Sequence, residues 1–202
     1  MINVGILGYG TVGSGVFDIL RDNSEIIGKR AGKDIKVKYV LDLRDFPGDP
    51  VEDVLVHDFS AIENDDDVQI VVETMGGLHP AYEFVKASLE KGKSVCTSNK
   101  ALVAAFGTEL IAIAKEKNVN FLFEASVGGG IPIIRPLQTS LAPDEIEQIS
   151  VLWFSLLVIY LSGFWSRIVL TSQLFTKRVG NVNLYFLSFC ICIFFFLEYL
   201  VE

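Results

Sequence analysis

The feature that most constrains the fold is a cluster of glycines near the N-terminus. Gly8, Gly10 and Gly13 stand in G-x-G-x-x-G spacing, directly after an apolar run at residues 2–7 that has strand character. Residues 14–21 then carry apolar side chains at helical spacing. Glycines at the turn between a first strand and a first helix are typical of a dinucleotide-binding unit.

Each glycine in this pattern has its own physical role. Gly8 makes the tight turn, Gly10 lets a pyrophosphate approach the backbone, and Gly13 lets the helix pack close to the strand. The free N–H groups and the dipole at the helix start then favour phosphate. The alternative is a glycine-rich turn that binds nothing, but strand, spacing and helix all agree with the binding site.

Composition excludes several classes of protein. The chain has 202 residues and a net charge of −8, which suits one α/β domain plus a further segment. The acidic balance argues against a nucleic-acid partner. Its three cysteines, Cys96, Cys190 and Cys192, show no framework spacing, and no signal peptide is recognisable. We therefore expect a cytoplasmic location.

The composition changes abruptly near Ser150. Both tryptophans and eight of the 15 phenylalanines follow it, and the remaining segment lacks Ala, Asp, Pro, His and Met. The charged residues of that segment are Arg167, Lys177, Arg178, Glu198 and Glu202. The two parts do not read like one protein, so we place a domain boundary between residues 1–149 and 150–202.

The second strand is expected at residues 35–41, which alternate and are rich in β-branched side chains. Asp42 and Arg44 follow it. In a dinucleotide fold an acid at this place binds the ribose 2′-hydroxyl, whereas an arginine accommodates a 2′-phosphate. Both are present, so NAD and NADP stay open, and ordinary charges on a solvated turn are the alternative.

Strands and helices alternate through the rest of the first part. We expect strands at residues 68–73, 94–97 and 120–123, with helices at 79–91 and 101–117. This alternation predicts an α/β fold with a doubly wound parallel sheet, a Rossmann-like NAD(P)-binding domain.

Several polar or glycine-rich segments fall at the carboxyl ends of these strands, where such sheets bind their ligands. They are Gly8 to Gly13, Arg44, Thr74 to Gly77, Ser98 to Lys100 and Glu124 to Gly130. Their convergence predicts a functional crevice.

Lys100 is a candidate for chemistry. A cation is poorly placed at the start of a helix, near the positive end of its dipole. Beside a nicotinamide, the ammonium could bind or polarise a substrate oxygen or accept its proton. The alternative is an ordinary surface lysine.

The glycine-rich stretch from Glu124 to Pro132 follows the last of these strands. Its backbone carbonyls and one carboxylate could bind a hard cation. A flexible connection to the next helix is the alternative.

With these motifs in place, the sequence closely resembles homoserine dehydrogenases over residues 1–149. The resemblance rests on Gly-Tyr-Gly-Thr-Val-Gly at 8–13, Thr-Ser-Asn-Lys-Ala at 97–101 and the segment 124–134. It implies reversible hydride transfer between NAD(P)H and L-aspartate 4-semialdehyde, giving L-homoserine in threonine, methionine and isoleucine biosynthesis.

The resemblance also implies roles for particular residues. Thr11 and Val12 would contact the cofactor, Arg44 would favour a 2′-phosphate, and Lys100 would be catalytic at the nicotinamide–substrate junction. The expected cofactor-binding residues are Gly8, Gly10, Thr11, Val12, Gly13, Arg44, Thr74, Ser98 and Lys100. A sodium site would be formed by Glu124, Val127, Gly129 and Ile131.

The last part of the chain departs from the family. Members continue into a substrate and dimerisation domain that carries a second catalytic lysine and an aspartate, and intact members are expected to be homo-oligomers. Residues 150–202 carry instead an apolar tail that we expect to be helical. One interpretation is a membrane hairpin with spans at 151–175 and 184–201, although Arg167 is costly there. The abrupt change favours the other, an out-of-frame translation or disrupted gene.

These features lead to two hypotheses. The first is a homoserine dehydrogenase-like oxidoreductase, acting on a small-molecule substrate and impaired by loss of its substrate domain. The second is a non-catalytic, membrane-attached nucleotide-binding module, with the membrane reached only through the tail. A one-base shift after codon 150 that restores a family-like domain would exclude the second.

Overall fold

The computed structural model describes residues 1–140 together with five short segments, 149–151, 156–158, 168–170, 174–179 and 182–187. The chain divides into two units, Met1–Ala142 and Pro143–Glu202. Each unit is described by itself.

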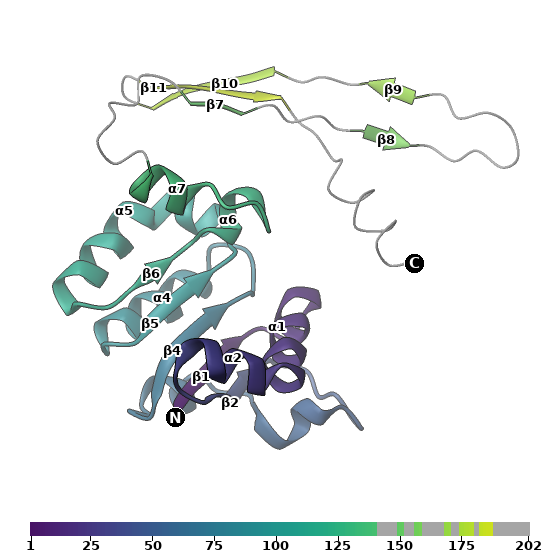
Figure 1. The fold of residues 1–202 in the computed structure, drawn as a ribbon, viewed down its shortest axis with the longest axis vertical. Helices are drawn as coiled ribbons and strands as arrows, with labels where there is room; N and C mark the ends of the chain where they lie inside the picture. Colours follow the sequence, from purple (N-terminus) through teal and green to yellow (C-terminus); the bar gives the residue numbers. More distant parts are fainter. Residues whose placement is uncertain (141–148, 152–155, 159–167, 171–173, 180–181, 188–202) are drawn as a thin grey trace, which may run out of the picture. The chain divides into compact units, whose positions relative to one another are not determined.

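The first unit is built on a six-stranded sheet with the strand order β3-β2-β1-β4-β5-β6, in which every pairing is parallel. The strands are β1 (Ile2–Leu7), β2 (Ile35–Leu41), β3 (Leu55–Val56), β4 (Val68–Glu73), β5 (Ser94–Thr97) and β6 (Phe121–Leu122). This confirms the doubly wound parallel sheet, because the chain runs outward from β1 in both directions (Figure 1).

Helices connect the strands. They are α1 (Thr11–Asp22), α2 (Ser24–Ala31), α3 (Ser60–Glu63), α4 (Ala81–Glu90), α5 (Lys100–Lys117), α6 (Ala125–Gly128) and α7 (Ile134–Thr139), with a 3-10 turn η1 at Pro50–Val54. The predicted helices at 79–91 and 101–117 correspond to α4 and α5.

The central strand β1 explains why helices lie on both faces of the sheet. Ile6 and Leu7 are both fully buried, yet as neighbours in a strand they point to opposite faces. Ile6 packs in a cluster with Phe17 of α1, and Leu7 packs in a second cluster with residues of α4 and α5 such as Val85 and Leu110. An apolar run buried on both faces is the mark of a parallel strand.

The second unit contains strands where we expected helix. A three-stranded sheet has the order β10-β11-β7 and a two-stranded sheet pairs β8 with β9. The strands are β7 (Ile149–Val151), β8 (Leu156–Val158), β9 (Ile168–Leu170), β10 (Leu174–Val179) and β11 (Val182–Leu187). These described segments are strands, and they are rich in the β-branched and aromatic side chains that favour strands.

The strands β10 and β11 pair antiparallel, with Val179 opposite Val182 and Leu174 opposite Leu187.

The proposed membrane spans at 151–175 and 184–201 lie for the most part outside the described residues. Within the described part of the chain, no helix combines the length and apolar character needed to cross a bilayer.

Candidate functional site

The glycine loop joins β1 to α1 and shows two different uses of glycine. Gly8 has φ +95°, and a Cβ atom added to Gly13 would lie 1.9 Å from the Gly8 carbonyl oxygen. A Cβ atom added to Gly10 would meet nothing within 4 Å. Gly13 therefore permits close packing of helix against loop, whereas Gly10 leaves open space in front of the backbone.

The start of α1 is suited to an anion. Gly10 is the N-cap residue and contributes no side-chain hydrogen bond, and no acidic residue lies in the first turn. Thr11 and Val12 are exposed there. The first N–H groups of a helix have no partners within the helix, so this end of α1 offers donors to a phosphate.

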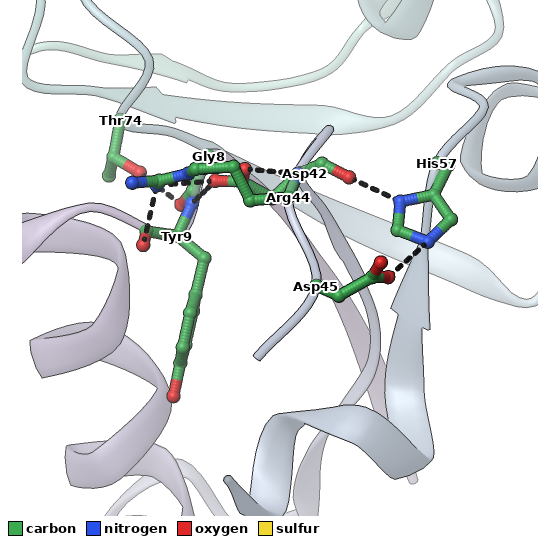
Figure 2. Close-up of polar contacts among 7 residues, drawn as sticks. All are labelled: Gly8, Tyr9, Asp42, Arg44, Asp45, His57 and Thr74. Carbon is green, nitrogen blue, oxygen red and sulfur yellow. Dashed lines mark hydrogen bonds and ion pairs between the residues drawn. The ribbon is translucent and has the colours of Figure 1, made fainter. Parts of the chain in front are cut away.

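Thr74, which follows β4, is bound to the loop itself. Its backbone N–H donates to the Leu7 carbonyl at 2.9 Å. Its hydroxyl lies 2.9 Å from the Gly8 carbonyl oxygen (Figure 2). The same hydroxyl lies 3.0 Å from the Leu7 carbonyl oxygen, so it donates to this pair of acceptors. The structure thus gives Thr74 the role of holding the glycine loop against β4.

Asp42 and Arg44, which follow β2, form one assembly with the loop. The Asp42 carboxylate accepts hydrogen bonds from the Tyr9 N–H at 2.8 Å, from the Arg44 N–H at 3.0 Å and from two guanidinium nitrogens at 3.0 Å each. Arg44 Nη2 also donates to the Tyr9 carbonyl at 3.2 Å (Figure 2). The Arg44 guanidinium therefore lies across the end of β2 and is tied to the glycine loop.

The electrostatics of this assembly follow from its contacts. The guanidinium of Arg44 holds the pKa of Asp42 well below its ordinary value, against the opposing effect of burial, and the Tyr9 N–H lowers it further. The same ion pair raises the pKa of Arg44. Because the Arg44 side chain is 63% exposed, its positive charge stays accessible to a ligand.

Tyr9 is a residue of this site that sequence reasoning missed. Its ring is buried between Phe17 and Phe46, and its hydroxyl donates to Asp49 at 2.9 Å. Burial, with the hydrogen bond to Asp49, raises the pKa of Tyr9 to about 12. No local pattern marks an aromatic residue between two loop glycines for this role.

His57 is the second residue that was missed. Its Nδ1 lies 2.7 Å from the Asp42 carbonyl oxygen and its Nε2 lies 3.2 Å from Asp45 Oδ1 (Figure 2). His57 thereby connects the segment after β3 to the segment after β2. The sequence separation of 15 residues from Asp42 hides this contact.

Ser98 and Lys100 lie at the junction of β5 and α5. The Ser98 N–H donates to the Glu73 carbonyl at 3.4 Å, which links the ends of β5 and β4. Lys100 is the first residue of α5 and is exposed. Among the described residues, no carboxylate oxygen lies within ion-pair distance of its ammonium group.

In the segment predicted to bind sodium, the Glu124 carboxylate is already occupied by backbone hydrogen bonds. The Glu124 carboxylate accepts hydrogen bonds from the backbone N–H groups of Ile133, Ile134 and Arg135 at the start of α7. These bonds, that from Ile133 foremost, lower the pKa of Glu124.

The remaining residues of that set supply no side-chain oxygen. Val127 and Ile131 are exposed apolar residues, and Gly129 has φ +60°. Within the described residues, no group of three or more His, Cys, Asp or Glu side chains could hold a metal ion. The sodium site stays a prediction without support from this geometry.

The class of protein follows from these observations. A parallel sheet flanked by helices, with a glycine loop at the β1–α1 turn and an acid–arginine pair after β2, defines a Rossmann-like, dinucleotide-binding α/β domain.

The family follows from comparison with known proteins. The model of the homoserine dehydrogenase NAD-binding domain matches residues 8–124, more than half of the chain. The chain therefore belongs to the homoserine dehydrogenase family.

Individual relatives agree. Over 151 residues the chain is 40% identical to a homoserine dehydrogenase of Neisseria gonorrhoeae, covering 74% of this chain and 35% of that protein. It is 42% identical over 147 residues to the homoserine dehydrogenase of Helicobacter pylori, covering 72% of this chain and 34% of that protein. The chain thus spans about a third of the length of its curated relatives.

Solved structures give the same result. A homoserine dehydrogenase from Thiobacillus denitrificans superposes with a TM-score of 0.65 at 42% identity, covering 72% of this chain and 34% of that one. A hyperthermophilic archaeal homoserine dehydrogenase in complex with NADPH superposes with a TM-score of 0.56 at 29% identity, covering 67% of this chain and 47% of that one.

Proposed function

We propose that this chain binds a nicotinamide dinucleotide as the cofactor portion of a homoserine dehydrogenase. The observation that carries the proposal is a contrast within the glycine loop. The Gly8 carbonyl packs directly against Gly13, whereas Gly10 faces open space at the start of α1. A backbone left bare beside exposed helix N–H groups fits a pyrophosphate. Thr11 and Val12 would lie against the cofactor.

We propose further that the cofactor is NADPH in preference to NADH. Both Asp42 carboxylate oxygens already accept hydrogen bonds from Tyr9 and Arg44, so they are poorly available to a ribose hydroxyl. The exposed guanidinium of Arg44 can instead pair with a 2′-phosphate. The archaeal relative named as an NADPH complex supports this choice.

The reaction would be the NAD(P)-dependent interconversion of L-homoserine and L-aspartate 4-semialdehyde. The bound cofactor would supply or accept the hydride. Lys100 lies at the end of β5, on the side of β1 opposite to Arg44, where its ammonium would bind or polarise the substrate oxygen. The exposure of Lys100 leaves it accessible to a substrate.

A predicted sodium ion would compete with an existing contact. The Glu124 carboxylate would have to share its oxygens with, or leave, the N–H groups at the start of α7. We therefore place no step of the proposed function on this ion.

Catalysis also needs residues that hold the substrate, because hydride transfer requires a near-attack geometry. In longer relatives we expect those residues in the part that this chain does not match. The tail offers Lys177, Arg178 and Glu198 but no acid–lysine pair like the expected family motif. We therefore expect the 202-residue chain to bind NADPH without measurable oxidation of homoserine.

The test is a homoserine oxidation assay on the unmodified chain and on a chimera with a homologous substrate domain grafted after Ile149. We expect activity only in the chimera, and a strong decrease when the chimera carries Lys100→Ala. Lys117→Ala, at the far end of the same helix, is the matched control and should leave the rate unchanged. Turnover by the unmodified chain near the rate of an intact family member would contradict the proposal.

A further inference from the structure

A chain of buried polar side chains joins the ends of β4 and β5. Glu73, the last residue of β4, is 0% exposed. Thr97, the last residue of β5, and Asn99, just before α5, are also buried. Burying a carboxylate costs free energy unless it is fully hydrogen-bonded, so the hydrogen-bond partners of Glu73 must compensate for its burial.

The Glu73 carboxylate organises the turn that follows its own strand. Oε1 accepts hydrogen bonds from the N–H groups of Met75 at 2.8 Å and Gly76 at 3.2 Å. Gly76 and Gly77 both have φ in the left-handed region, at +75° and +73°. The carboxylate thus holds a turn whose backbone conformation favours glycine.

The other carboxylate oxygen connects this turn to the neighbouring strand. Glu73 Oε2 accepts from the Thr97 hydroxyl at 2.5 Å, and the Thr97 oxygen accepts from the Asn99 N–H at 2.9 Å. Asn99 Nδ2 donates to the Gly77 carbonyl at 2.5 Å, which closes the ring of contacts.

Asn99 also begins the next helix. Its Oδ1 accepts from the Leu102 N–H at 3.0 Å, so it caps α5, and Lys100 follows it directly. The network of Glu73, Thr97 and Asn99 therefore fixes two things at once: the backbone of the turn after β4, and the point from which Lys100 projects.

The position of this network in the sheet indicates which half of the dinucleotide site it belongs to. Arg44 and its assembly follow β2 on one side of β1, whereas the network follows β4 and β5 on the other side. A doubly wound sheet binds a dinucleotide across this point, with one mononucleotide on each half. Since the 2′-phosphate side belongs to Arg44 in the proposed function, the network lies on the nicotinamide side.

We propose that Glu73, Thr97 and Asn99 are positioning residues for the nicotinamide half of the cofactor and for Lys100. This inference rests on the proposed function. The network holds the Met75 to Gly77 turn and the start of α5 at a fixed separation, so that a nicotinamide bound between them meets a preformed surface. The competing account is that the network only stabilises the fold.

Two ligands separate these accounts in the 202-residue chain. NADPH spans both halves of the site, whereas adenosine 2′,5′-bisphosphate offers only the adenosine half and its 2′-phosphate. Thr97→Val removes the hydroxyl while keeping the shape, and it should weaken NADPH by about tenfold, the effect of losing one or two hydrogen bonds. Binding of the bisphosphate should change by less than about twofold, since its contacts lie on the β2 side.

Two further variants and one control complete the test. Thr97→Ser keeps the hydroxyl and should restore NADPH binding. Asn99→Ser keeps an oxygen that can cap α5 but removes the donor to the Gly77 carbonyl. It should therefore also weaken NADPH binding without weakening bisphosphate binding. This variant decides between the two accounts if Thr97→Val fails to fold. Ser88→Ala removes a different buried hydroxyl, which donates to Phe84 within α4, and should leave both ligands unaffected.

The outcomes distinguish this inference from the function on which it rests. Equal losses for both ligands, or unchanged NADPH binding in folded Thr97→Val and Asn99→Ser chains, would overturn the positioning role alone. A wild-type chain that binds neither ligand would overturn the proposed function, and this inference with it.

Discussion

Replacing Gly10 by valine should weaken nucleotide binding while leaving the fold intact. Gly10 has φ −87°, which any residue adopts, and an added Cβ atom meets nothing within 4 Å. A branched side chain would fill the space that the pyrophosphate needs. We expect NADPH affinity to fall at least tenfold, about 1.4 kcal/mol, with a stability change of about 1 kcal/mol or less at this helix cap.

Gly13→Ala, in contrast, should destabilise the fold. Its Cβ atom would lie 1.9 Å from the Gly8 carbonyl oxygen, and real Cβ contacts are essentially never shorter than 3.0 Å, so loop and helix must separate by about 1.1 Å. Such overpacking costs about 1–3 kcal/mol. For a chain of this size we expect the melting temperature to fall by roughly 2–12 °C.

The assay combines NADPH fluorescence titration with thermal unfolding for each variant. Gly15→Ala is the control, because Gly15 lies in the same helix and also faces open space. It should leave NADPH binding unchanged and slightly raise stability through helix propensity. Unchanged NADPH binding in Gly10→Val would refute the assignment of the loop as a pyrophosphate site.

Two further predictions concern the assembly after β2. Arg44→Ala should weaken NADPH by about tenfold or more and NADH much less, because only NADPH presents a phosphate to the guanidinium; equal losses in parallel titrations would remove Arg44 from the ribose site. The folded-state pKa of Asp42 lies well below its ordinary value of 3.8. The stability that its carboxylate contributes is therefore present above about pH 3.8 and is lost progressively as the pH falls from there towards the folded-state pKa. In urea unfolding between about pH 6 and pH 2, Asp42→Asn should therefore show a shallower loss of unfolding free energy than the wild type, and identical slopes would contradict this account.

The sequence predicted the parts of the fold that depend on local periodicity. The strand bounds 35–41, 68–73 and 94–97 coincide with β2, β4 and β5, because each is a run of β-branched or alternating apolar residues bounded by turns. The edge strand β3 was missed, since two residues, Leu55 and Val56, are too few to show a period.

The site was predictable in outline but not in its contacts. Gly8, Gly10 and Gly13 are recognisable because their spacing is local. The bond from the Tyr9 N–H to Asp42 spans 33 residues, and that from the Thr97 hydroxyl to Glu73 spans 24. Such contacts depend on how strands are ordered in the sheet, which no spacing along the chain records.

The tail shows the limit of composition as a guide. The break near Ser150 was visible in the residue counts. Apolar composition alone does not separate helix from strand, however. The β-branched and aromatic side chains of β10 and β11 carried the strand signal.

The most direct test of the central claim is an isothermal titration of NADPH into the purified 202-residue chain. We expect saturable binding of NADPH to one site per chain, weaker binding of NADH, and NADPH binding weakened at least about tenfold in Gly10→Val. A wild-type chain that is folded by circular dichroism yet releases no binding heat with NADPH or NADH would contradict the claim that this domain is a nicotinamide dinucleotide site.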